Sequence, residues 1–515
     1  MPKKSSSERL LFDLIHSLTK AEKRSFKLYA KRSGDTRSAK FVKLFDIMER
    51  LPEYDEQTII NKMGDVTKTQ FANQKVHLYA QLLASLRQSY LNHDIDIQLR
   101  EQLDYIRLLY KKGLYDQSLR LLNRAKGVTG QYRKDLFQLS LLDYEKQIRS
   151  QQVFDLEEEQ VNELDQETRE SMQRFANVQR FFSTAIKLKA RFVERGMAKN
   201  NVEMEEIEAL FPEDLRVIPE EGLAFNERFY LYRAWFWYSY LTYDFDRCTI
   251  YAKKWVDLFE ESAMDDKRRA AFLKGLNRLL QSAFRANDRV HFDQYYERLM
   301  NFDQVQDTAL ASNTALLLTK YRAIQLLNYA FLHGVFDDSL EAVEMALEQV
   351  AHSKDFLDRH TLLIIHYKAA IYFFARNELD RALQHADEVV KDPDNLRSDL
   401  KGFARIVRLI IYYERAEDDL MERKIRTTYS YLKQQHNLGK YQVTILDFIN
   451  KLGTIYPQDI KKGFGALKEQ LVALQGDKFQ SRPLLYFDII SYLDAKIEGR
   501  TFAEIVKRKV AERNS

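Results

Sequence analysis

Residues 108–125 read LLYKKGLYDQSLRLLNRA, and the pattern of this stretch is typical of a helical hairpin. Its apolar residues recur at helical spacing up to Gly113, whose backbone allows a helix to end tightly. Tyr115 follows two residues later and Ser118 three residues after that. The aromatic ring fills the corner between two helices, and the small side chain lets their axes approach. The next inward positions are Leu122 and Ala125. The stretch therefore predicts two antiparallel helices joined at Gly113.

The same order of turn, aromatic and small residues recurs downstream. The later turns fall near positions 243, 287, 334 and 377, which are 44, 47 and 43 residues apart. The copy at 287 is degenerate, because Arg289 stands where the aromatic belongs. The copy at 377 is followed by Pro393, where its second helix should end. This recurrence predicts a series of helical hairpins.

These motifs resemble the tetratricopeptide repeat (TPR) family, whose helical hairpins stack into a right-handed solenoid. The resemblance covers residues 97–127 and 225–395 with visible motifs. The family repeats every ~34 residues, so the spacing here indicates longer helices or a broader TPR-like repeat. Because members of the family are mostly binding scaffolds, the resemblance implies binding without catalysis. Residues 18–23 are also similar to the start of uncharacterised bacterial proteins, which implies no function.

The composition favours an all-α fold. The chain has 16 Gly and 7 Pro among 515 residues, well below the usual ~7% and ~5%. Sheet proteins need more of these residues, because they turn every ~8–12 residues. Apolar runs stay far short of the ~20 residues that a membrane-spanning helix needs. We expect an N-terminal basic helical module joined to a TPR-like α-solenoid of antiparallel hairpins.

We expect three parts along the chain. They are a basic helical module at 1–93, helical hairpins at 94–211 and a TPR-like solenoid at 222–515. The second part includes the first TPR-like unit and a long amphipathic helix at about 157–195, with an apolar stripe from Val161 to Ile186. That stripe could pack inside the solenoid or against a coiled-coil partner. Two Pro residues and Gly222 mark the last boundary.

Positive charge is concentrated at the N-terminus. Residues 1–40 hold eleven basic and four acidic residues, a net charge of +7, whereas the whole chain carries +4. Such asymmetry marks either a nucleic-acid contact or a solvated helix face. Residues 55–75 show a short helix, a turn at Gly64 and a second helix, the outline of a helix-turn-helix. The residues expected to contact DNA or RNA are Lys20, Lys23, Arg24, Lys27, Lys31, Lys68 and Asn73.

The sequence contains no pattern of an enzyme that we recognise. It lacks a phosphate-binding loop, paired cysteines, a His-Glu-x-x-His motif and a Gly-x-Ser-x-Gly elbow. Its one cysteine, Cys248, sits at a packing position of a hairpin. We therefore expect a cytoplasmic protein without catalytic activity, cofactor or metal.

The aromatic segment 229–245 is the most unusual part of the chain, because its rings cover the whole circumference of one helix. These rings either pack on both faces or leave one face to a groove. In TPR proteins the first helix of each hairpin lines the concave groove. The resemblance thus implies partner-binding residues Tyr230, Arg233, Trp237, Tyr240, Lys274, Asn277, Gln281, Arg285, Tyr321, Asn328 and Tyr367.

These residue types would suit an extended peptide. Amides can bond its backbone, and Arg and Lys can bind its carboxylates. We expect a protein- or peptide-binding scaffold. The alternative is a regulator whose residues 1–93 contact nucleic acid while the solenoid binds a peptide or protein.

Overall fold

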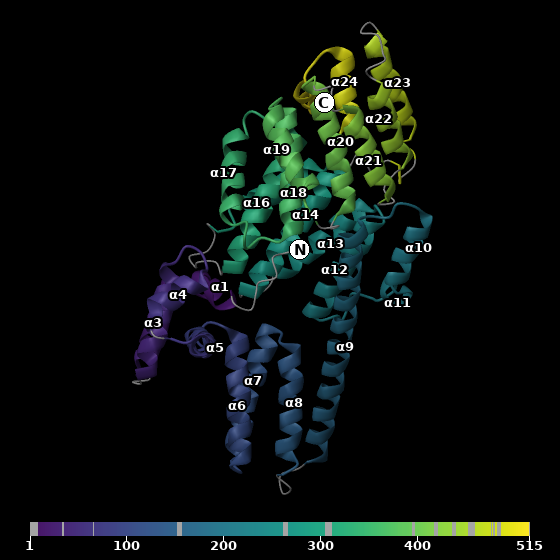
Figure 1. Ribbon diagram of the computed structural model, residues 1–515. Coiled ribbons are helices and arrows are strands. Elements are labelled where there is room, and N and C mark those ends of the chain that lie inside the picture. The colour runs from purple at the N-terminus through teal and green to yellow at the C-terminus, as the bar shows by residue number, and fades with distance from the viewer. Residues whose placement is uncertain are drawn as a thin grey trace. The chain divides into compact units, whose positions relative to one another are not determined.

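The computed structural model describes residues 9–513, apart from 33–35, 65, 152–156, 261–265, 304–311, 394–396, 417–420, 435–438, 452–458, 475, 477–478 and 481–485. Every regular element in these residues is an α-helix, which confirms the all-α prediction (Figure 1). The chain divides into two compact units, residues 1–176 and 177–515. None of the helices in the described ranges is long and apolar enough to cross a lipid bilayer.

The first unit contains nine helices or parts of helices. They are α1 (Leu10–Ser17), α2 (Lys20–Arg32), α3 (Thr36–Arg50), α4 (Glu56–Met63), α5 (Lys68–Tyr90), α6 (Ile95–Lys111), α7 (Tyr115–Tyr132), α8 (Asp135–Arg149) and the first part of α9 (Glu158–Arg195). Helices α1 to α5 share a core around Phe26, Phe45 and Phe71. Helices α6 to α8 share another around Leu99 and Leu122.

The second unit begins within α9 and continues to the C-terminus. Its helices are α10 (Asn201–Leu210), α11 (Glu213–Arg216), α12 (Phe225–Leu241), α13 (Phe245–Glu260), α14 (Asp266–Ala286), α15 (Arg289–Met300), α16 (Ser312–His333), α17 (Leu340–His352), α18 (Arg359–Ala375), α19 (Leu379–Val390), α20 (Ser398–Glu414), α21 (Met421–Gln434), α22 (Lys440–Lys451), α23 (Ile460–Ala473), α24 (Ile489–Glu498) and α25 (Phe502–Glu512).

Each of the five expected hairpin turns contains a residue with left-handed backbone. The φ angle is +73° at Gly113, +65° at Tyr243, +55° at Asn287, +68° at Gly334 and +60° at Asn377. In every case the next residue donates its backbone N–H to the carbonyl five residues earlier. This bond closes the end of the first helix, as in the Schellman motif. The predicted turns are therefore tight helix ends.

The residue five positions after the turn is small and buried in four of the five pairs, and it is Phe292 in the pair at Asn287. Ser118 donates its hydroxyl to the carbonyl of Ile106 over 2.9 Å, and Cys248 places its thiol 3.6 Å from the carbonyl of Phe236. Both acceptors lie seven residues before their turn. A small donor thus satisfies a carbonyl of the first helix where the second helix crosses it.

Consecutive helices of the second unit pack in pairs, α12 with α13, α14 with α15, α16 with α17 and α18 with α19 (Figure 1). The first helices also contact one another, since α14 packs on α16, α16 on α18 and α18 on α20. The C-terminal helix α25 returns to pack on α16. This packing is compatible with a helical repeat.

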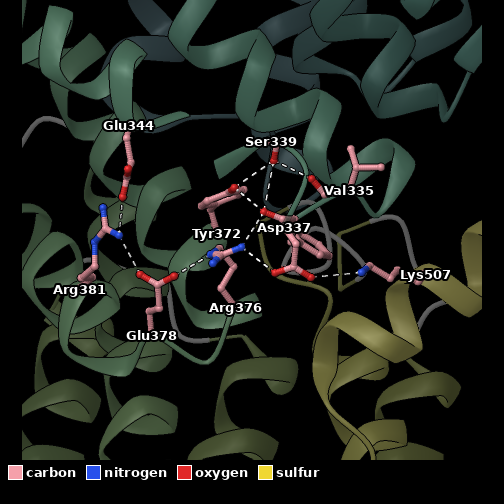
Figure 2. Close-up of polar contacts among 10 residues, drawn as sticks. Val335, Asp337, Ser339, Glu344, Tyr372, Arg376, Glu378, Arg381 and Lys507 are labelled. Carbon is pink, nitrogen blue, oxygen red and sulfur yellow. Dashed lines mark hydrogen bonds and ion pairs between the residues drawn. The ribbon is translucent and has the colours of Figure 1, made fainter. Parts of the chain in front are cut away.

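Polar contacts join the turn of one pair to the turn of the next. Figure 2 shows Arg376 between Asp337 and Glu378, with N–O distances of 2.7 and 2.6 Å. The hydroxyl of Tyr372 lies 2.9 Å from that of Ser339. Because these residues come from both corners, the network holds the relative position of the two pairs.

The long helix α9 exists as predicted, but its buried stripe differs. Every seventh residue from position 164 to position 192 is buried, including the polar Ser171. The expected stripe is wrong at Val161, Met172 and Ile186, which are 40%, 59% and 48% exposed. The buried positions of α9 recur every seven residues, whereas the expected stripe includes two successive steps of four residues. Such steps move the stripe away from the buried face of the helix, which explains the error.

Candidate ligand-binding cavity

The second unit contains a cavity of about 830 Å³ that is partly open to solvent. Its wall is formed by the second part of α9, by the first helices α12, α14, α16 and α18, and by α25, with further residues from α13, α20 and α24. Ligand sites in proteins typically measure ~300–1,000 Å³. The cavity therefore has the size of a site for a small ligand or a short segment of a larger one.

Ten of the eleven residues expected to bind a partner line this one cavity. They are Arg233, Trp237, Tyr240, Lys274, Asn277, Gln281, Arg285, Tyr321, Asn328 and Tyr367. Tyr230 is not among the lining residues, because its ring packs 4.5 Å from that of Phe182. The inward faces of the first helices thus meet around a common space.

The aromatic segment of α12 is mostly buried. Trp237 and Tyr240 are only 4% and 2% exposed, and each ring centroid lies 5.3 Å from that of Phe192. Trp235 stacks on Tyr251 of α13 at 5.1 Å, on another side of the helix. The segment is packed between neighbouring helices, and only part of it borders the cavity.

Helix α14 contributes a polar stripe to the wall. Lys274, Arg278, Gln281 and Arg285 lie at positions i, i+4, i+7 and i+11, and this stripe extends ~16 Å along the helix. Arg278 donates to Oε1 of Gln281, and Gln281 donates to the hydroxyl of Tyr240, each over 2.7 Å. These bonds hold the Arg278 guanidinium in place.

Amide side chains form a second feature of the wall. Nζ of Lys368 donates to Asn328 over 2.6 Å, Asn328 donates to Gln325 over 2.7 Å, and Gln325 donates to Asn277 over 2.8 Å. The chain of hydrogen bonds runs from α18 through α16 to α14. It holds the amide side chains in place. It also uses some of the amide hydrogen-bonding groups that were expected to bind a peptide backbone.

The lining is strongly basic. Its basic residues are Lys189, Arg233, Lys274, Arg278, Arg285, Lys320, Lys368, Arg397, Lys509 and Arg513, and its acidic residues are Asp358 and Asp488. Asp358 is 2.8 Å from Nζ of Lys320, and hydrogen bonds help to lower its pKa to about 2 although burial opposes this. Arg397 pairs with Asp399 at 2.8 Å. The remaining positive charge is suited to an anion.

Two basic groups in the cavity are shifted toward the neutral form. Burial, together with the charge of Arg285, lowers the pKa of Lys368 to about 7. Burial, followed by the charge of Arg397, lowers the pKa of His360 to about 3. His360 is consequently neutral at pH 7, and its Nδ1 has no hydrogen-bond partner among the described residues.

Sequence reasoning missed several cavity residues. Arg278 lies on the same face of α14 as Lys274 and Gln281, so helical spacing alone could have predicted that it lines the cavity. Lys189 was placed in a separate helical part of the chain. Lys509 lies on α25, which reaches the cavity only through long-range packing that no local pattern indicates.

The residues expected to contact nucleic acid lie on α2 and α5, and two of them are held in ion pairs. Lys23 pairs with Glu49 at 3.3 Å, and Lys27 pairs with Asp46 and Glu49 at 2.8 and 3.2 Å. Tyr90 at the end of α5 donates to Glu22 at the start of α2. Lys68 and Asn73 are exposed near the other end of α5, ~25–33 Å along the helix from Tyr90. Lys20, Arg24 and Lys31 are also exposed.

The predicted helix-turn-helix outline contains the expected helices. Helix α4 ends before Gly64, which has a φ of +91°, and α5 begins at Lys68. The exposed residues at the start of α5 include Thr67, Thr69 and Gln70. This geometry leaves the first turn of α5 open to solvent.

Comparison with known proteins found no matching family model, curated protein or solved structure. Within the described residues, no three His, Cys, Asp or Glu side chains gather as a metal site would require.

Proposed function

We propose that the protein is a non-catalytic binding protein and that the second unit holds an acidic protein or peptide segment in its cavity. The helix pairs of this unit are arranged, in this proposal, as a TPR-like solenoid of antiparallel hairpins. The observation that carries the proposal is the composition of the cavity wall, which holds ten basic and two acidic residues. Lys320, Arg397 and Lys509 are each paired with a carboxylate, and the other basic residues of the wall still outnumber its acids. Proteins use such concentrations of Arg and Lys to recognise acidic motifs.

The wall also supports an elongated partner. The α14 stripe places Lys274 and Arg285 three helical turns apart, with Gln281 between them. Carboxylates spaced along a peptide could pair with the ends of this stripe. Tyr321 and Ile324 on α16 add apolar surface to the same wall.

A peptide-display experiment tests this function. Random peptides are selected on the immobilised full-length protein, and the selected sequences are compared with the starting library. We expect enrichment of Asp and Glu, and about tenfold weaker capture by Lys274→Glu, because one charge-assisted contact becomes repulsive. Lys462→Glu is the control, since this side chain is 84% exposed outside the cavity. Selection of peptides without excess acid, or equal capture by both variants, would contradict the proposal.

The second candidate function is a nucleic-acid-binding regulator. The observation in its favour is the exposed start of α5, where Lys68 and Asn73 face solvent after a tight turn. The ion pairs of Lys23 and Lys27 weigh against it, because they neutralise two of the seven expected contacts. Gel-shift assays with duplex DNA, single-stranded DNA and RNA at two salt concentrations separate the candidates. Nucleic-acid contacts would weaken steeply with salt.

A further inference from the structure

Resting on the proposed function for the location of the site, we propose that Lys189, Arg233, Lys274 and Arg278 bind a phosphoryl group of the ligand. We call these four residues the basic cluster. Lys189 comes from α9, Arg233 from α12, and Lys274 and Arg278 from successive turns of α14. All four line the cavity, so three helices contribute charge to one space.

The four positive charges are close enough to influence one another. Burial, and then the charges of Arg278, Arg233 and Lys274, lower the pKa of Lys189. Burial and the charges of Arg233 and Arg278 likewise lower the pKa of Lys274. Both lysines line the cavity and keep exposed surface that a ligand can reach. A cluster of this kind gains most from a ligand with several negative charges.

No carboxylate neutralises the basic cluster within the described residues, where none of its members forms an ion pair. The acid with the clearest influence on it is Asp358, and this carboxylate is held by Lys320 and by the backbone of Thr361. Arg397, which is also buried, differs from the basic cluster because it pairs with Asp399 at 2.8 Å. The anion that complements the basic cluster must therefore come from the ligand.

Aromatic rings hold the two guanidinium groups. Arg278 lies 4.6 Å from the ring centroid of Trp237, and Arg233 lies 5.2 Å from that of Tyr230 and 5.7 Å from that of Trp255. Nε of Arg233 is buried without a hydrogen-bond partner among the described residues. A guanidinium packed on a ring keeps the N–H groups at its edge for an anion.

The number of charges selects a phosphoryl group over a single carboxylate. One carboxylate carries one negative charge and would leave most of the basic cluster unneutralised. A phosphate monoester carries about −1.5 to −2 at pH 7 and has three strong acceptor oxygens. Two arginines and two lysines offer both the charge and the N–H donors for these oxygens.

The phosphoryl group has two sources, a free organic phosphate or a phosphorylated side chain of a peptide. Equilibrium binding to the full-length protein distinguishes them with four probes. Phenyl phosphate is compared with benzoate at matched ionic strength, and a peptide library with one fixed phosphoserine is compared with the same library unphosphorylated. Tryptophan fluorescence reports binding of the small probes, because Trp237 and Trp255 line the cavity.

We expect phenyl phosphate to bind about tenfold more tightly than benzoate, and Arg278→Met to remove that preference. Lys462→Met is the matched control and should leave the preference unchanged. Thermal melts confirm folding, and loss of one repelling charge should not lower the melting temperature. Lys274→Met provides a second variant for the same comparison.

The outcomes separate this inference from the proposed function. If phenyl phosphate binds through the basic cluster and neither library binds, the phosphoryl site stands with a free organic phosphate as its ligand, and the peptide function fails. If the phosphoserine library binds more tightly than its unphosphorylated form, the source is a peptide and both proposals stand. If phosphorylation gives no gain in either comparison, or Arg278→Met keeps the gain, the phosphoryl site is wrong, whether or not acidic peptides bind.

Discussion

At the scale of single residues, the turns show why the hairpins could be recognised. Gly113 and Gly334 were clear signals, because glycine adopts positive φ without steric cost. Asn287 and Asn377 are the next most tolerant type. Ala416 also has a φ of +55° at the end of α20, yet alanine carries no signal for that conformation. The turn after α20 was therefore not predictable from its own residue.

Cys248 tests the role of the small residue after the turn. It is fully buried, and burial raises the pKa of its thiol well above the usual value. Cys248→Ser should cost less than about 1 kcal/mol of unfolding free energy, because Ser118 makes the equivalent contact. Cys248→Leu should cost about 1–3 kcal/mol through overpacking. Urea unfolding measures both, and equal costs would show that volume at this position does not matter.

Lys368 should make stability depend on pH. Its pKa is about 7 in the folded chain and ~10.4 when unfolded, so the unfolded state binds more protons between these values. Unfolding free energy should therefore rise as pH increases from 7 to 9, by about 2 kcal/mol from this group. Below pH 7 the penalty is fully present.

The control for this pH effect is Lys368→Met, which removes the titrating group. Urea unfolding of both proteins at pH 7 and pH 9 isolates its contribution from that of other groups. The native protein should gain more stability than the variant. An identical gain in both would show that Lys368 is charged throughout the range.

At the scale of elements, helical spacing predicted most of the cavity wall. The stripe of Lys274, Gln281 and Arg285 follows from one face of one helix, and α14 keeps that face inward. Spacing could not identify which neighbour faces it. Lys189 could not be predicted in this way. The buried seam of α9 includes Ser171 and Ala185, whose side chains do not mark a buried face in the sequence.

The contact between α25 and the turn after α16 is testable at Gly334. A Cβ at this position would lie 3.1 Å from Cα of Lys507. Gly334→Ala should therefore cost about 2–3 kcal/mol, combining the strain of positive φ with displacement of α25. Gly499→Ala is the control, since its φ is +71° and no atom lies within 4 Å of the new Cβ. It should cost only about 1 kcal/mol, and equal losses in denaturant unfolding would show that α25 does not press on this turn.

At the scale of the whole chain, local sequence motifs did not predict the division into two units. The helix pair around Gly113 lies in the first unit, and the other four pairs lie in the second. The boundary falls inside α9, where no proline, glycine or change of composition marks it. Closure of the cavity by α25 depends on contacts between residues more than 150 positions apart, such as Arg289 with the carbonyl of Val510.

All lining residues of the cavity belong to the second unit, the first in sequence being Lys189. A fragment of residues 177–515 should therefore fold alone, because its helices bury their apolar faces on one another. We expect a cooperative thermal melt followed by circular dichroism, and an affinity for phenyl phosphate or the selected peptides within about twofold of that of the full chain. The fragment carrying Arg278→Met should lose affinity to the same extent as the full-length variant. A folded fragment that no longer binds would show that residues 1–176 complete the site, and an unfolded one would show that the second unit requires the first for stability.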